Sequence, residues 1–160
     1  MSRADARINL ILDEVVRTLS AIDGDPDLWL TSPKKVLRWC SNPMSQPQPL
    51  VLVRCKEWGP NEPQTGVQHD GQAVIEVELL CGMGSQADDP ARELHRLAAD
   101  VLSALESNWR LHDASDTPVV PGLQFHVISG YEPAVTLTES GIASTVIEFR
   151  AFWPWEAATP

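Results

Sequence analysis

The sequence lacks the features that mark membrane spans, disulfide frameworks and secreted proteins. No run of about 18 apolar residues occurs, so we expect no segment to cross a bilayer as a helix. The three cysteines, Cys40, Cys55 and Cys81, are widely spaced and form no C-x-x-C motif, which favours reduced, packed thiols. The N-terminal segment is charged throughout and does not resemble a signal peptide. We therefore expect the protein to stay where it is made, or in a particle built there.

Basic side chains are also scarce. The chain of 160 residues has 12 Lys and Arg against 22 Asp and Glu, a formal net charge of -10. Such a surface repels phosphate at long range, which argues against a basic patch that grips nucleic acid. Simple solubility explains the same acidity and remains the alternative.

Catalytic and metal-binding motifs are missing as well. The segment 82–85 (Gly-Met-Gly-Ser) has neither the Lys-Ser/Thr ending of a P-loop nor the flanks of a nucleophile elbow. Glu76 and Glu78 share one strand face, as catalytic carboxylates can, but solvated strand faces carry such pairs far more often. The histidines are scattered, with no H-E-x-x-H and no zinc spacing: His69, His95, His112 and His126. We predict no catalytic, cofactor-binding or metal-binding residue, and no enzyme activity.

Two segments carry apolar residues at helical spacing. The first extends from Ile8 to Ile22 and stops at Asp23-Gly24. The second starts at Asp89, a good N-cap, with Pro90 in the first helical position, and its apolar stripe ends at Leu105. In each helix the charged residues lie outside the apolar stripe and are expected to face outward. They include Asp13, Glu14 and Arg17 in the first helix and Asp100 in the second.

The remaining segments predict strands. They are a short strand around 35–39, two long ones at 50–58 and 73–81, and extended segments at 123–127, 134–138 and 143–153. The polar segment 59–72 is expected to be a long hairpin tip, and 154–160 a C-terminal tail. The order is α-β-β-(β)-α-β-β in one domain, 1–160. This predicts an α+β fold whose mainly antiparallel sheet carries both helices on one face. The other face must be wet or meet another chain.

Four stretches together resemble a known family. They are INLILDEVVRTLSAI, PLVLVRCKEW, AVIEVELLCGMGSQADDPARELHRLAADVLSAL and GYEPAVTLTESGIASTVIEFRAFWPW. Their layout is similar to that of the tail terminator, or tail completion, proteins of long-tailed bacteriophages, also described as minor tail or head–tail joining proteins. The resemblance covers nearly the whole chain and lies in layout and periodicity, not in an invariant motif.

The resemblance implies a homohexameric ring at the head-proximal end of the tail tube. Such a ring stops tube growth and joins the tube to the neck, or head completion, protein, and a long hairpin reaches the neighbouring subunit. DNA passes through the lumen without specific binding. The protein would then be part of the virion, at the head–tail junction, after assembly in the host cytoplasm. No catalytic residue and no cofactor are implied.

The aromatic residues near the C-terminus give a candidate subunit interface. The chain has six Trp, and Trp153-Pro154-Trp155 lies close to its end. Because Trp is enriched at interfaces, we predict contacts through Val67 in the hairpin tip and through Phe152, Trp153 and Trp155. The alternative is that these rings close one end of the subunit's own core.

Three other functions stay open at this point. One is a neck or head-completion connector of the same particle, and a second is an adaptor or chaperone. The third is a small cytosolic enzyme whose cleft is lined by His126, Glu76 or Cys81 with shifted pKa values.

Overall fold

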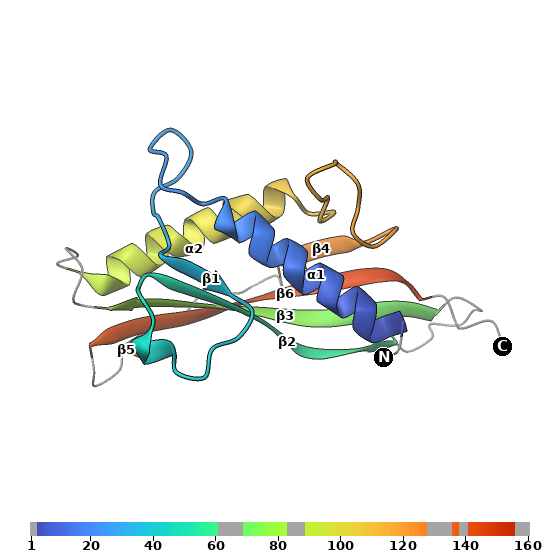
Figure 1. The fold of residues 1–160 in the computed structure, drawn as a ribbon, viewed down its shortest axis with the longest axis horizontal. Coiled ribbons are helices and arrows are strands. Elements are labelled where there is room, and N and C mark those ends of the chain that lie inside the picture. The colour runs from blue at the N-terminus through green and yellow to red at the C-terminus, as the bar shows by residue number, and fades with distance from the viewer. Residues whose placement is uncertain (1–2, 61–68, 83–88, 128–135, 138–140, 156–160) are drawn as a thin grey trace.

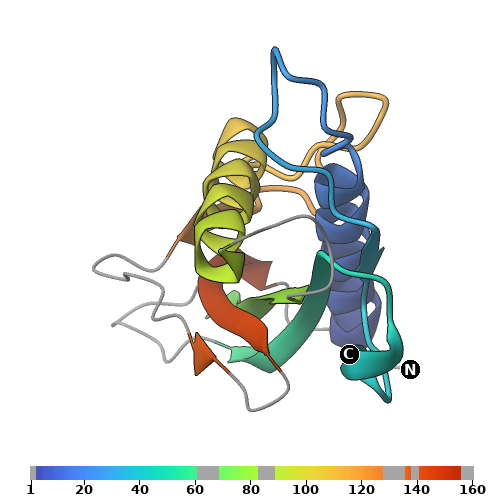
Figure 2. The ribbon, with the colours of Figure 1, turned by 90° about the vertical axis from the view of Figure 1, so that its left-hand side faces the viewer.

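Two helices lie on one face of a sheet in the computed structural model (Figure 1). The structure describes residues 3–60, 69–82, 89–127, 136–137 and 141–155. Seen from one end, the helices α1 and α2 stand next to each other beside the strands (Figure 2). The predicted α+β class, with both helices on one face of a mainly antiparallel sheet, is confirmed.

The helices begin and end close to where the sequence indicates. Helix α1 spans Arg3–Ser20 and helix α2 spans Pro90–Ser107. The Asp89 carboxylate accepts the N–H groups of Ala91 and Arg92 at 3.0 and 3.2 Å, so it satisfies two donors that the first turn leaves without intrahelical partners.

The sheet follows the path β1-β2-β3-β6-β4, and β5 also pairs with β6. Strands β1 and β2 are parallel, and all other neighbours are antiparallel. A short 3₁₀ turn, η1, lies between β1 and β2. The bounds are β1 Lys35–Leu37, η1 Pro43–Ser45, β2 Leu50–Pro60, β3 His69–Gly82, β4 Gln124–Val127, β5 Thr136–Leu137 and β6 Ile142–Trp155.

The main core fills the space between the helices and the sheet. Alternate residues of β3 point into it, from Ala73 to Cys81, and they meet the apolar stripes of both helices. The rings of Phe125 and Phe149 stack there at 5.0 Å. A second, smaller cluster of Leu50, Leu52, Leu80 and Ile142 lies on the opposite face, with Leu37 and Cys40 packed against it.

Three long strands extend beyond the predicted bounds. Strands β2 and β3 pair as far as Gly59 with Gln72 and Pro60 with Gly71, inside the segment expected to be a hairpin tip. A register shift between Cys55 and Glu57 marks a β-bulge, which turns the last part of β2. Strand β6 likewise continues through Trp155. Continuous pairing of β3 with β6 accounts for the extra length, because every added residue gains a ladder partner.

The outward orientation expected for Glu14 and Asp100 is wrong. Both are buried, at 5% and 4% exposure. Arg17 Nε donates to both Glu14 oxygens at 2.9 Å, and the Thr18 hydroxyl donates to one of them at 3.3 Å. These donors offset the free-energy cost of removing the Glu14 carboxylate from water. The spacing of apolar residues in the helix does not reveal such donors.

Candidate assembly surfaces

The residues predicted for a subunit interface have different surroundings. Trp153 is 1% exposed and belongs to the main core. Phe152, its neighbour in β6, points to the opposite face and is half-buried, with Gln72 and Gln124 beside it in register. Val67 and the side chain of Trp155 lie outside the described residues. The structure therefore does not bring the four residues together, and their role in an interface stays a prediction.

The sheet face opposite the helices carries a ladder of ion pairs. Arg54 Nε donates to Glu76 Oε2 at 2.6 Å, and Lys56 Nζ donates to Glu148 Oε1 at 2.6 Å. The hydrogen bond that Arg54 donates to Glu76 raises the pKa of Arg54, and the one that Lys56 donates to Glu148 raises the pKa of Lys56. Glu78 completes the ladder at 3.8 Å from Arg54. These opposite charges face each other on neighbouring strands, so they stabilise the pairing of β2, β3 and β6.

The residues of the enzyme alternative do not form a cleft. Glu76 belongs to the ion-pair ladder, whereas Cys81 is buried on the helix side of β3. Burial, followed by the nearby Glu93 charge, raises the pKa of Cys81 to about 11, so the thiol stays protonated at neutral pH and is a poor nucleophile. His126 lies on β4, two strands away from Glu76. Among the residues that the structure describes, no three His, Cys, Asp or Glu side chains could hold a metal ion. Neither described helix has the length and apolar character needed to span a bilayer.

A loop between α1 and β1, residues 23–33, is tied to α2 by a buried carboxylate. The Leu30 N–H donates to both Asp100 oxygens at 3.0 Å, and Thr31 donates to Asp100 Oδ2 through its N–H at 2.8 Å and its hydroxyl at 2.6 Å. Two leucines of the loop nevertheless remain in solvent, Leu28 at 70% and Leu30 at 64% exposure. The loop thus presents apolar side chains from a fixed backbone.

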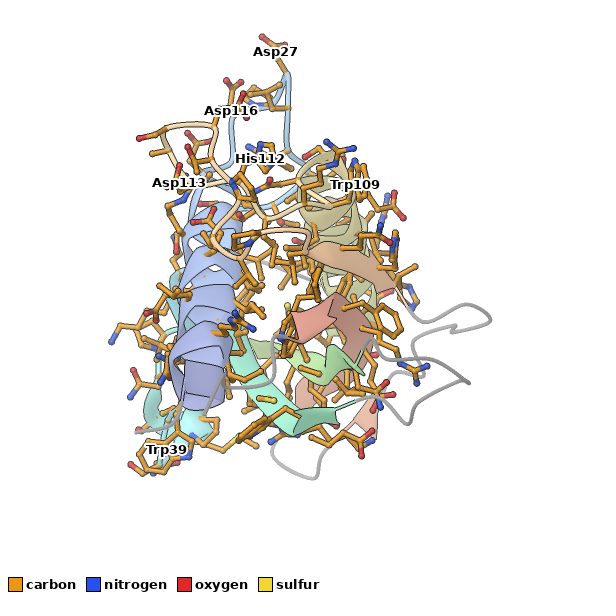
Figure 3. All side chains as sticks on the ribbon, turned by 90° about the vertical axis from the view of Figure 1, so that its right-hand side faces the viewer. Asp27, Trp39, Trp109, His112, Asp113 and Asp116 are labelled. Atoms are coloured by element: carbon orange, nitrogen blue, oxygen red, sulfur yellow. The ribbon has the colours of Figure 1, made fainter. Side chains whose placement is uncertain are left out.

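A tryptophan just beyond α2 separates two depressions. Trp109 is 38% exposed, its ring stacks on His126 at 6.0 Å, and the Arg110 guanidinium lies 4.5 Å from its centroid. One depression, about 280 Å³, has an apolar floor and is lined by Leu105, Glu106, Trp109, Phe125, His126, Val127 and Phe149. The other, about 250 Å³, is lined by Trp109, Arg110, His112, Pro118, Gly122, Leu123 and Gln124. Figure 3, which looks along the long axis of Figure 1, shows Trp109, His112 and Asp27 on the same side of the molecule.

Sequence reasoning missed the tryptophans that are exposed. Trp39 is 76% exposed, Trp58 is 44% exposed and Trp109 is 38% exposed. Trp109 stands four residues after Leu105, so it continues the apolar stripe of α2 past the end of the helix, and this spacing was the available signal. Trp58 follows the β-bulge, whose presence the alternation of β2 does not predict.

Comparison with known proteins gave structural similarity only. No family model and no curated protein sequence matches the chain. Among solved structures, the chain is similar to the sheath/tube terminator of an extracellular contractile injection system, PVC, in its extended state, with a TM-score of 0.38 and 15% sequence identity. The match covers 93% of this chain and 60% of that one, so the chain spans less than two thirds of the length of that terminator.

Proposed function

We propose that this chain is a structural subunit of a tail-like particle and acts as its tube terminator. In this role, several copies form a ring on the head-proximal end of the tail tube, stop its growth and present a surface to the neck. The layout that resembles tail terminators supports the proposal, because the helices and strands occur in the order which that resemblance implies.

The observation that carries the proposal is the exposure of large apolar side chains on a fully formed subunit. Among the residues that the structure describes, seven are exposed and belong to neither core cluster: Leu10, Leu28, Leu30, Trp39, Met44, Trp58 and Trp109. Three of the seven are Trp, the residue most enriched at the centres of protein interfaces. Association with other chains would remove these side chains from water, which favours a subunit of an assembly.

The proposed ring is a homohexamer closed by heterologous contacts, in which two different patches of each subunit meet. Val67, Phe152 and Trp155 remain proposed contact residues, and Trp153 would support them from the core. The tail tube protein and a neck protein are the proposed partners, and DNA passes the acidic subunits without specific binding.

The test is a tube-capping experiment. The purified chain is analysed by size-exclusion chromatography with light scattering, and is then added to polymerising tube protein encoded by a neighbouring gene. Closed rings that bind one tube end and limit tube length support the proposal. Tubes that grow without limit in the presence of saturating chain contradict it. Rings that bind only a head-side connector, and not the tube, indicate the neck connector instead.

A further inference from the structure

The loop 23–33 is built as a rigid projection. The Asp25 N–H donates to Asp23 Oδ1 at 3.0 Å, and the Asp27 N–H donates to Asp25 Oδ1 at 3.1 Å, which makes two successive side-chain turns. The N–H groups of Leu28 and Trp29 both donate to the Asp25 carbonyl, at 2.9 and 2.7 Å. These bonds, together with the Asp100 anchor, fix the backbone that carries the leucines.

Gly24 closes the base of this projection. Its φ is +83°, in the left-handed region, and a Cβ there would lie 2.9 Å from Ser32 Cβ. The two ends of the loop therefore pack against each other at a position that only glycine fits. Between them, Trp29 packs on the main core while Leu28 and Leu30 point outward.

The projection combines apolar and acidic groups. It carries Asp23, Asp25 and Asp27 and has no basic residue from 23 to 33. All three aspartates are exposed, and Figure 3 shows Asp27 at its outer end. A surface that receives this projection must therefore offer an apolar depression with positive charge at its rim.

The depression of about 280 Å³ beside Trp109 has an apolar floor, and two arginines lie next to residues of its lining. Its floor contains the stacked Phe125 and Phe149, and Trp109 forms one wall. Arg110 lies over the Trp109 ring and lines the neighbouring depression, and Arg150 is the ladder partner of His126. The lining itself also contains one acidic residue, Glu106. Within the part of the chain that the structure describes, neither arginine is in an ion pair, whereas five other basic residues are: Arg17, Arg38, Arg54, Lys56 and Arg96.

The projection and the depression cannot meet within one subunit. In Figure 1 the loop before β1 rises on the left of the molecule, and the connection that follows α2 lies on the right. Asp100, which anchors the loop, lies in the middle of α2, about two turns before Trp109. A contact between the two surfaces must therefore join different copies of the chain.

We propose that the 23–33 loop of one copy docks into the Trp109 depression of the next copy. Leu28 enters between Trp109 and the two phenylalanines, and Asp27 approaches Arg110. The contact is heterologous, because each copy presents a projection on one side and a depression on the other, and it can repeat around a closed ring. This inference rests on the proposed ring and names the surfaces that would close it.

The first experiment uses two variants that each lack one surface. Leu28→Asp removes the projection and Trp109→Ala removes the wall of the depression, and each alone should lower self-association at least tenfold. Mixed together, the two variants should form a heterodimer that cannot grow further, because one intact projection and one intact depression remain. His95→Asp is the control: it introduces the same acidic side chain at an exposed position of α2 that belongs to neither surface, and should assemble as the wild type does.

The second experiment exchanges charges. Asp27→Arg or Arg110→Asp alone should weaken association, and the double variant should restore it, which a general loss of folding cannot do. The monomer must keep its thermal unfolding midpoint in every variant. Single variants that assemble like the wild type overturn the inference, as does a wild-type chain that is monomeric at every concentration. Intact rings that fail to limit tube length would contradict the proposed terminator role but leave this contact standing.

Discussion

The Thr31 hydroxyl donates to the buried Asp100 carboxylate at 2.6 Å, across 69 residues of sequence. With the N–H groups of Leu30 and Thr31, it gives this carboxylate hydrogen-bond donors on both oxygens. A carboxylate at 4% exposure is stable in the folded state only with such donors. The bond thus joins the α1–β1 loop to the middle of α2.

We expect Asp100→Ala to lower the free energy of unfolding by about 3 kcal/mol, because it leaves buried backbone donors without an acceptor. Asp100→Asn, which keeps one carbonyl oxygen, should cost less. Asp27→Ala is the control, since Asp27 is exposed, and should stay within about 0.5 kcal/mol of the wild type. Urea unfolding measures the three values. Amide exchange should also become faster at Leu30 and Thr31 in Asp100→Ala and not in the control.

The secondary structure was largely predictable because apolar spacing is local information. Both helices and the alternation of β3 follow directly from residues three, four or two positions apart. The bulge in β2 and the full length of β6 were not predictable, since each depends on the neighbouring strand. Asp100 shows the same limit, because its burial depends on a loop 69 residues away.

The candidate surfaces were less predictable than the fold. The sequence does not distinguish Trp153 from Trp109 by burial. Only the packing of the folded chain places Trp153 in the core and Trp109 at the surface. The exposed Leu28 and Leu30 occur in a proline-containing segment with no periodicity, so no pattern distinguishes them from buried loop residues. Surface roles depend on what the folded chain leaves uncovered.

Trp153 gives a test of core against interface. Because its side chain is 1% exposed and packs in the main core, Trp153→Ala should destabilise the isolated subunit by about 4 kcal/mol. Thermal unfolding of the monomer measures this loss. The exposed Trp39→Ala is the matched control and should change monomer stability by less than about 1 kcal/mol. A Trp153→Ala monomer as stable as the wild type would show that the indole side chain does not contribute to the core.

Gly122 is expected to tolerate no side chain. Its φ is +72°, and an added Cβ would lie 2.8 Å from Cδ and 2.9 Å from Cγ of Pro154. Gly122→Ala should therefore lower the free energy of unfolding by more than about 1 kcal/mol, through both left-handed backbone strain and the clash with β6. Gly59→Ala is the control, because no atom lies within 4 Å of its added Cβ. Equal unfolding midpoints for the two variants would contradict the expectation.

Cys81 should make the fold less stable at alkaline pH. Burial raises the pKa of its thiol from 9.0 to about 11 in the folded chain. Between these values the unfolded chain releases a proton that the folded chain retains, so the free energy of unfolding falls as the pH rises from 9 and levels off near 11. Burial also raises the pKa of Cys55, so this thiol adds a further loss of stability over the same rise in pH. The Cys81→Ala variant loses a constant amount of stability to the cavity, which is measured at neutral pH and subtracted. We then expect its free energy of unfolding to fall less steeply between pH 9 and 11 than that of the wild type. Urea unfolding at pH 7, 9 and 11 measures both curves, and parallel curves would show that the Cys81 thiol ionises equally easily in the folded and unfolded chain.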